Sequence, residues 1–227
     1  MGWSKDGSKD GSKDRSKDRS KDGSRDDGSK GGSRQDESQS DGRVRRGVRN
    51  RGRIVDALLA LVGRGTLLPT AEEVAAEAGV GTRTVFRHFD DMEALYLELT
   101  ARIAGEVAPL LEAPLPAGRP DARARALVAR RVELFERIAP FKRSGNLVRW
   151  RSQVIEADHR RMVEVLRAEL AAVLAPEIVP EPGGAFDAIE LLTSFEAWDR
   201  LRADCRQSSE RTRAILEAAV VALVEAS

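Results

Sequence analysis

The segment Thr70–Leu95, with the sequence TAEEVAAEAGVGTRTVFRHFDDMEAL, constrains the fold of this chain more than any other. Glu73 follows Thr70 at the spacing of a capping box, in which the hydroxyl and the carboxylate each accept a backbone N–H from the other residue. A helix therefore begins after Thr70. Gly79 supplies the left-handed residue that ends this helix after about two turns.

A second short helix is expected from Gly81 to Phe89. Val85 and Phe89 are one helical turn apart, so they share a face and point inward. The other side chains point outward or sideways and form a slim, cationic outer face: Thr82, Arg83, Thr84, Phe86, Arg87 and His88. Asp90 and Glu93 repeat the capping spacing, so a third helix is predicted to begin at once.

Two short helices joined by a glycine turn can place the second helix in the major groove of DNA. The residues AGVGTRTVFRHFDDMEAL closely resemble the helix-turn-helix signature of the TetR family of transcriptional regulators, and the resemblance extends from Arg53 to Leu99. It implies a sequence-specific DNA-binding regulator whose activity depends on a small-molecule effector. We expect a homodimeric repressor on a palindromic operator, because two-fold symmetry in the protein is matched by symmetry in its DNA site.

Three positions depart from the family pattern. Gly81 stands where a capping serine is usual, Phe86 where tyrosine is usual, and Met92 where lysine is usual. Replacing a capping serine with glycine lowers helix stability by only about a few tenths of a kcal/mol. The missing tyrosine and lysine typically contact phosphate, so the chain is expected to use other cations for that purpose.

The predicted DNA contacts fall into two groups. The second helix places Thr82, Arg83, Thr84 and Arg87 against the major groove, with Phe86 and His88 on the same surface. Arg83 is the best candidate for a bidentate contact with guanine, which contributes about 1–3 kcal/mol of discrimination. His88 is more often structural in such a position, with a phosphate contact as the second interpretation.

The second group lies ahead of the helix-turn-helix. Residues 43–53 contain six arginines and no acidic residue, beginning with Arg43, Arg45 and Arg46. A solvated helix start is one interpretation of this run. We favour an arm that follows the DNA backbone or enters the minor groove, together with a phosphate contact from Thr70.

Residues 1–42 repeat Ser-Lys-Asp-Gly and Ser-Lys-Asp-Arg, with six Lys and four Arg against nine Asp and one Glu. The segment has no net charge and almost no apolar side chain, so we expect it to be disordered rather than a DNA clamp. It does not resemble a secretory signal. The chain thus divides into a tail at 1–42, a helix-turn-helix domain at 43–99, and an effector-binding and dimerisation domain at 100–227.

The larger domain is predicted to be helical, which makes the whole protein all-α. Pro109 is expected to bend or end the helix that begins near Asp90, and Pro120 to start the next one. Ala139-Pro140 should break that helix, and residues 176–184, rich in Pro and Gly, should form a linker. One helix is then predicted to carry Leu191, Phe195, Trp198 and Cys205, and a last helix to begin near Ser209.

The last helix is apolar around more than half of its girth, so it must bury two sides. A second subunit would cover the side that the monomer leaves open, giving a four-helix homodimer interface from the last two helices of each chain. The alternative is an ordinary core helix. The resemblance to TetR regulators favours the dimer.

Composition argues against several other classes of protein. No run of about eighteen apolar residues is present, which excludes a transmembrane helix. The single cysteine fits a reducing cytoplasm, and with two histidines it provides no metal-ligand set. We therefore predict a cytoplasmic protein that is not an enzyme and needs no cofactor or metal. Cys205 is expected to be a small core residue.

Four aromatic residues are candidates for an effector cavity: Phe141, Trp150, Phe195 and Trp198. Aromatic residues at helical spacing are also common in protein cores. Two other functions stay open at this point, a helical small-molecule-binding protein that no longer binds DNA, and an all-α enzyme that uses the cavity of the larger domain.

Overall fold

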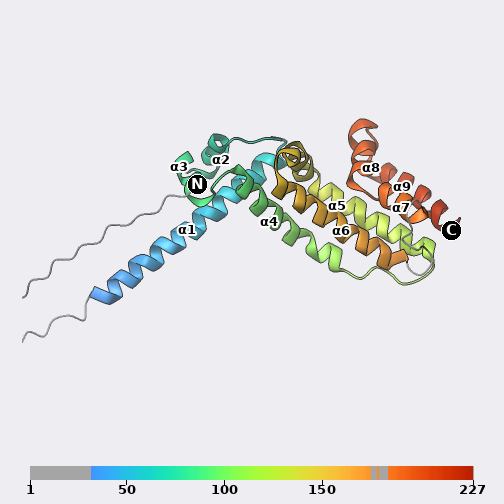
Figure 1. The fold of residues 1–227 in the computed structure, drawn as a ribbon, viewed down its shortest axis with the longest axis horizontal. Helices are drawn as coiled ribbons and strands as arrows, with labels where there is room; N and C mark the ends of the chain where they lie inside the picture. Colours follow the sequence, from blue (N-terminus) through green and yellow to red (C-terminus); the bar gives the residue numbers. More distant parts are fainter. Residues whose placement is uncertain (1–31, 175–177, 179–183, 227) are drawn as a thin grey trace, which may run out of the picture. The chain divides into compact units, whose positions relative to one another are not determined.

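The computed structural model describes residues 32–174, 178 and 184–226, and it describes side chains from Arg46 onward. This part of the chain is helical and contains no strand, which confirms the all-α prediction (Figure 1). Its α-helices are α1 (Gly32–Gly63), α2 (Ala71–Ala78), α3 (Thr82–His88), α4 (Met92–Glu112), α5 (Pro120–Val148), α6 (Gln153–Leu174), α7 (Ala185–Leu192), α8 (Phe195–Asp199) and α9 (Ser209–Glu225). A 3₁₀ turn, Arg149–Arg151, follows α5, and a π turn, Arg200–Asp204, follows α8.

The chain forms two compact units, Met1–Arg43 and Val44–Ser227. Most of the predicted tail, residues 1–31, lies outside the described residues. Residues 32–42 of the predicted tail are helical and belong to α1, which begins at Gly32, ahead of the arginine-rich run. The predicted division between residues 99 and 100 falls within α4.

The helix-turn-helix forms where its local signals place it. Thr70 Oγ1 accepts a hydrogen bond from the Glu73 amide at 3.2 Å, and the Glu73 carboxylate accepts one from the Thr70 amide at 2.8 Å. Gly79 ends α2 with a φ of 63°, a conformation that costs glycine little. Gly81 caps α3 without a side-chain hydrogen bond, as the sequence predicts.

The third helix begins one residue later than the capping pattern predicts. Asp91, rather than Asp90, is the N-cap, and its carboxylate accepts a hydrogen bond from the Ala94 amide at 2.8 Å. The extended backbone of Phe89, which ends α3, buries the phenylalanine ring, and the next two residues are needed to turn the chain. The spacing of Asp90 and Glu93 is therefore not used as a capping box.

The predicted break at Pro140 is wrong, and of the two outcomes expected at Pro109, a bend or an end, the helix does not end there. Pro109 lies inside α4, which continues to Glu112, and Pro140 lies inside α5, which continues to Val148. Each proline removes one backbone donor, but the residues around it pack against the hydrophobic core, which includes Ile138 and Ala139 beside Pro140. Packing against the core therefore stabilises each helix enough to continue past its proline. Pro120 does start α5, as predicted.

The core joins the helix-turn-helix to the larger helical region. Ile54 and Leu58 of α1, Val74 of α2, Val85 of α3 and Leu95 of α4 are all buried in one hydrophobic cluster. In the larger region α5 is the central helix, because it packs against α4, α6, α8 and α9. Six large apolar residues of α5 are buried: Leu127, Val128, Val132, Leu134, Phe135 and Ile138.

The helix predicted to carry Leu191 through Cys205 is interrupted. The α7 helix ends at Leu192, and Ser194 caps a new helix, α8, by accepting a hydrogen bond from the Ala197 amide at 3.2 Å. Cys205 is exposed, so its assignment to the core is wrong. Cys205 is the C-cap of the π turn, and the left-handed backbone of Arg206, with a φ of 53°, ends the helical path directly after it.

The predicted linker at 176–184 lies largely outside the described residues. The last helix begins at Ser209, as expected. Among the described residues, no helix combines the length and the apolar composition needed to cross a membrane.

Replacing Thr70 with alanine tests the energetic role of the capping box. We expect Thr70→Ala to lower the free energy of unfolding by about 0.5–2 kcal/mol, because the Glu73 N–H loses the hydroxyl that accepts its hydrogen bond. Urea denaturation measures the change. Thr70→Ser keeps the hydroxyl and should retain most of the stability, so equal losses in the two variants would contradict this role.

Candidate nucleic-acid interface and ligand pocket

The short helix α3 has a buried face and an exposed face. Val85 is 1% exposed, and Phe89, its C-cap residue, is 3% exposed. The opposite face carries the exposed side chains of Arg83, Phe86 and Arg87, with Thr82 and Thr84 partly exposed. Burial of Val85 and Phe89 thus turns the polar and cationic residues of α3 toward solvent.

Two arginines of the predicted arm hold the helix-turn-helix together. The Arg51 guanidinium donates to the His88 carbonyl at 2.8 Å and to the Glu98 carboxylate at 2.7 Å, and it lies 4.3 Å from the centre of the Phe89 ring. It therefore connects α1, α3 and α4. Arg53 donates to the Ala78 carbonyl at the end of α2 at 2.5 Å.

Other residues of the predicted arm lie on α1. Arg43 and Arg45 are helical, but they precede the first side chain that the structure describes. Arg46 and Arg49 are exposed. Arg46 and Arg49 therefore project from a helix, α1. Thr70 is also exposed, with its hydroxyl engaged in the capping box.

His88 differs from the other residues of α3 because its ring is only partly exposed. A Cβ placed on Gly47 would lie 4.0 Å from His88 Cε1, so the ring rests against α1. Its Nε2 atom is buried and has no hydrogen-bond partner among the described residues. Burial, followed by the charges of Arg87 and Arg51, lowers the pKa of His88 and favours the neutral imidazole. This environment suits a packing role better than a phosphate contact.

The four aromatic residues predicted to line an effector cavity do not gather around one. Phe195 and Trp198 are buried and pack with Phe135 of α5, with ring centres 5.5–5.9 Å apart. Trp150 is 71% exposed and contacts the Arg151 guanidinium. Phe141 is partly buried against the core. Phe195 is the one member of this set that lines the cavity described next.

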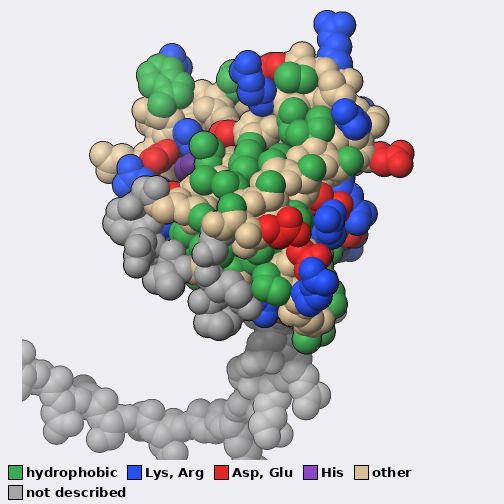
Figure 2. All heavy atoms as spheres, turned by 90° about the vertical axis from the view of Figure 1, so that its right-hand side faces the viewer, with side chains coloured by type: hydrophobic (Ala, Val, Ile, Leu, Met, Phe, Trp, Pro, Cys, Tyr) green, Lys and Arg blue, Asp and Glu red, His purple; other side chains and the backbone are tan. Residues whose placement is uncertain are grey.

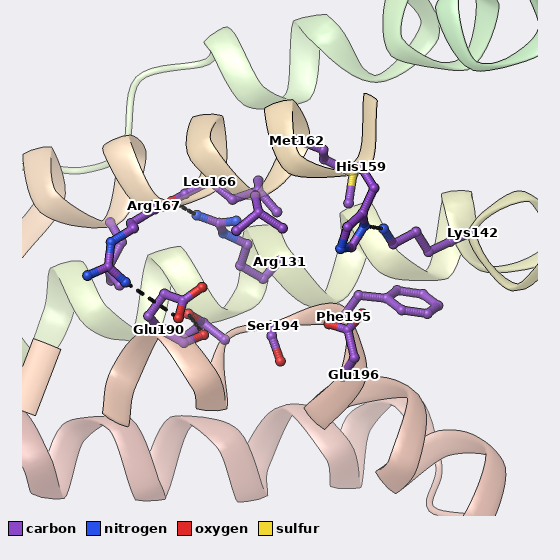
Figure 3. Close-up of a pocket in the computed structure, with 13 residues that line it drawn as sticks. Arg131, Lys142, His159, Met162, Leu166, Arg167, Glu190, Ser194, Phe195 and Glu196 are labelled. Atoms are coloured by element: carbon purple, nitrogen blue, oxygen red, sulfur yellow. Dashed lines mark hydrogen bonds and ion pairs between the residues drawn. The ribbon is translucent and has the colours of Figure 1, made fainter. Parts of the chain in front are cut away.

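A small cavity of about 30 Å³ lies between α5, α6 and the α7–α8 corner (Figure 3). Its apolar walls include Met162, Leu166 and Phe195. Four cationic or basic groups and two carboxylates also line it: Arg131, Lys142, His159, Arg167, Glu190 and Glu196. Sequence reasoning missed this set, because its members come from helices far apart in the chain.

Two of the pocket cations are paired with carboxylates. Arg131, which is 2% exposed, lies 2.6 Å from the Glu169 carboxylate and donates to the Leu166 carbonyl. Burial lowers the pKa of Arg131 to about 10 despite this pairing, so it stays cationic at neutral pH. Arg167 lies 2.7 Å from the Asp187 carboxylate.

Lys142 is held differently. Its ammonium contacts Nδ1 of His159 in a hydrogen bond, and Figure 3 shows the two groups facing each other between α5 and α6. Burial lowers the pKa of Lys142 to about 8. The pKa of His159 is also lowered, first by burial and then by the charges of Lys142 and Arg149.

A buried serine connects the pocket helix α5 to the helix-turn-helix region. Ser144 donates to the Leu67 carbonyl in the α1–α2 loop at 2.5 Å, and it lies 3.2 Å from the hydroxyl of Tyr96 in α4. Burial raises the pKa of Tyr96, so its hydroxyl remains protonated. Ser144 is two residues from Lys142 on the same helix. Helix α5 therefore carries both Lys142, which lines the pocket, and Ser144, which bonds to the segments that flank the helix-turn-helix.

Residues 54–99 match the model of the family described as bacterial regulatory proteins, tetR family. No match is found among curated proteins. A transcriptional regulator from Rhodococcus sp. Rha1 has a similar fold, with a TM-score of 0.64 and 20% sequence identity over 78% of this chain and 96% of that chain. A tetR-family transcriptional regulator from Streptomyces coelicolor superposes with a TM-score of 0.58 and 21% identity, over 76% of this chain and 81% of that chain.

The family match covers α2, α3 and the parts of α1 and α4 that pack on them, and the similar structures share the helical fold beyond it. Both of these similar proteins are described as transcriptional regulators. The residues that match the family model include the whole helix-turn-helix with its exposed cationic helix, α3. Residues 54–99 are therefore similar to the tetR family of bacterial regulatory proteins, and the chain as a whole shares its fold with the two transcriptional regulators named above.

Proposed function

We propose that this protein is a homodimeric transcriptional repressor that binds a palindromic operator and releases it when a small molecule occupies the larger helical region. The observation that carries the proposal is the orientation of α3. Val85 and Phe89 are buried, so Arg83 and Arg87 project from the opposite side of the helix. A short helix presented in this way fits the major groove.

The exposed residues of α3 supply two kinds of base contact. Arg83 is in the first turn of the helix and can form two hydrogen bonds with a guanine edge. Phe86 is 48% exposed, and an apolar side chain there can contact a thymine methyl group. Arg46, Arg49 and Thr70 are placed to contact the phosphate backbone, which would set the register of α3 on the duplex.

An uncovered apolar surface on the last helices supports a homodimer. The buried side of α9 packs on α5 and α7. On its other side α9 presents Ala218 and Ala222 to solvent, and Leu191 of α7 is 64% exposed. Figure 2 shows hydrophobic side chains gathered on the face that includes these helices, with charged side chains around them. A second copy placed by a two-fold axis would cover this surface.

The pocket and its connection to α4 support a response to a ligand. A ligand between α5 and α6 would change the position of α5, which carries Ser144. Through Ser144 a displacement of α5 reaches Leu67 and Tyr96, on the two segments that flank the helix-turn-helix. A ligand that binds better to one arrangement of these helices would shift the population toward it and alter DNA affinity.

Selection of bound duplexes from a random pool tests the proposal directly. A dimer with two α3 helices should enrich an inverted repeat whose half-sites are separated by whole turns of DNA. The logarithm of the binding constant should also fall linearly with the logarithm of salt concentration, by about 0.9 for each phosphate contact. A chain that enriches no motif and shows no salt slope on any duplex would not be a DNA-binding protein.

Replacing Arg83 tests base recognition. Arg83→Ala should weaken binding to the selected operator by about 1–3 kcal/mol and relax preference at one base pair in each half-site. Fluorescence anisotropy with single-base operator variants measures both effects. Arg160→Ala removes an exposed arginine of α6 and serves as the charge-matched control. Equal effects from the two substitutions would show that Arg83 contributes only general charge.

Arg49 and Arg51 form a second matched pair. Arg51→Ala should lower the free energy of unfolding by about 1–2 kcal/mol, because the hydrogen bonds of a half-exposed guanidinium to α3 and α4 are lost. Arg49→Ala should leave stability unchanged, and it should reduce DNA affinity and the salt slope by about one phosphate contact. Thermal denaturation and salt-dependent DNA titrations separate the two roles, and a reversed pattern would refute this assignment.

Ser144→Ala tests the polar link between α5 and the helix-turn-helix. The substitution leaves the Leu67 carbonyl and the Tyr96 hydroxyl without this partner, so we expect a loss of about 1–3 kcal/mol in stability. A double-mutant cycle with Tyr96→Phe should show that the two substitutions are not additive. Strict additivity would mean that Ser144 and Tyr96 are not energetically coupled.

A further inference from the structure

Lys142 is singled out by the composition of the chain. Residues 43–227 contain 27 arginines and only one lysine, Lys142. Arginine is the usual cation of this protein, both on its surface and in its buried ion pairs. Arginine keeps its charge at any physiological pH, whereas a lysine is a compact point charge that loses its proton readily when buried. Among the lysine and arginine positions after residue 42, Lys142 is therefore the one that does not carry a guanidinium.

The partners of Lys142 also differ from those of the arginines around it. Arg131, Arg143 and Arg167 each form an ion pair with a carboxylate. Among the described residues, Lys142 forms no ion pair; its ammonium contacts His159 and lies 6.0 Å from the centre of the Phe195 ring. The pocket therefore holds a partly buried ammonium that a carboxylate of the protein does not neutralise.

The charged groups that face Lys142 come from three elements. Glu196 is on α8, Glu156 and Asp158 are on α6, and Arg149 is in the 3₁₀ turn. Glu156 is engaged by Arg160 and Arg149, and Asp158 lies near Arg161. Glu196 is exposed to solvent. None of these carboxylates removes the effect of burial on Lys142, whose pKa remains lowered, to about 8.

His159 completes a pair of donors. Its lowered pKa keeps the imidazole neutral at pH 7, and the contact with the Lys142 ammonium assigns Nδ1 as the acceptor. Nε2 then carries the proton and is a donor. An ammonium and an imidazole N–H that line the same pocket, beside its apolar residues, can form a recognition site for a small anion, since both donors can bond to its oxygens.

We propose that the pocket binds a small molecule with one carboxylate and an apolar body, and that Lys142 and His159 hold the carboxylate. The inference rests on the proposed response to a ligand and names the chemical class of that ligand. The cavity of about 30 Å³ has room for a head group. The body would lie against Leu166 and Phe195 after movement of Met162, a flexible side chain that fills irregular spaces.

A phosphate ester fits this site less well than a carboxylate. The arginines that line the pocket are already paired with Glu169 and Asp187, so they offer no free fork of donors to a dianion. Lys142 supplies one positive charge and His159 one neutral donor. This balance matches a singly charged carboxylate.

Benzoate is a suitable probe, with benzamide as the uncharged molecule of the same shape. We expect titration calorimetry of the full chain to show binding of benzoate and at least tenfold weaker binding of benzamide. Lys142→Met should lower the affinity for benzoate at least tenfold, whereas Arg213→Ala, which removes an exposed arginine of α9 away from the pocket, should leave it unchanged. Melting temperatures of both variants verify that they are folded.

The pH dependence of binding identifies the group responsible. A bound carboxylate favours the charged ammonium, so it should raise the pKa of Lys142 above its free value of about 8. Affinity should then be fully present below pH 8 and fall by about tenfold for each pH unit above it. Lysine-selective NMR can follow the Lys142 side chain directly, because K142R removes its signal.

The outcomes separate this inference from the proposed function. If benzamide binds as tightly as benzoate, if K142M binds benzoate as well as the natural chain, or if affinity does not change above pH 8, the carboxylate site is refuted. Selection of an operator by the same preparation would still support a DNA-binding repressor. Binding of benzoate with the predicted pH profile, in a chain that selects no duplex, would retain the site and refute the repressor.

Discussion

The structure depends first on the burial of Val85 and Phe89. Helix α3 spans Thr82–His88, which is too short to be stable alone, and it begins at Gly81 without a side-chain cap. Two of its residues are threonines, which favour helices weakly. Burying one large apolar side chain contributes about 1.5–3 kcal/mol, which exceeds these local costs. The same burial decides which side of α3 faces outward, so stability and DNA recognition have one physical origin.

A network of buried charges fastens the larger region to α4. Arg130 and Arg131 of α5 share the carboxylate of Glu169 on α6. Arg130 also donates to the carbonyls of Leu111 and Ala113, at the end of α4, where a helix leaves its last carbonyls without internal partners. The two guanidinium groups and the shared carboxylate therefore join α4, α5 and α6 through polar contacts.

The features that could be predicted from the sequence are those decided within a few residues. The capping box of Thr70 and Glu73 and the left-handed Gly79 are complete within one turn of the chain, and the structure contains them as expected. The prolines were harder to interpret. A proline in a helix costs about 3 kcal/mol locally. Pro109 and Pro140 nevertheless lie inside helices, because the packing that outweighs this cost involves residues distant in sequence.

The pocket shows why the candidate ligand site could not be predicted. Lys142 and His159 are on different helices, and no spacing rule connects them. Phe195 and Trp198 suggested a cavity, but their rings pack with Phe135 and fill the core. The available signal was compositional, since a single lysine among many arginines marks a position with special chemistry. That signal indicates which residue matters, whereas only the fold shows what surrounds it.

The contacts of Arg51 have a consequence for how a ligand could control gene expression. One guanidinium bonds to α3 and to α4, and Arg53 fixes the end of α2 to the same helix, α1. These contacts join the four helices, so a tilt of α4 would carry α3 with it. In the proposed dimer, such a tilt would change the distance and angle between the α3 helices of the two subunits, while the bases that each α3 prefers would stay the same. Induction would then alter tolerance for the spacer between half-sites, not the half-site sequence itself.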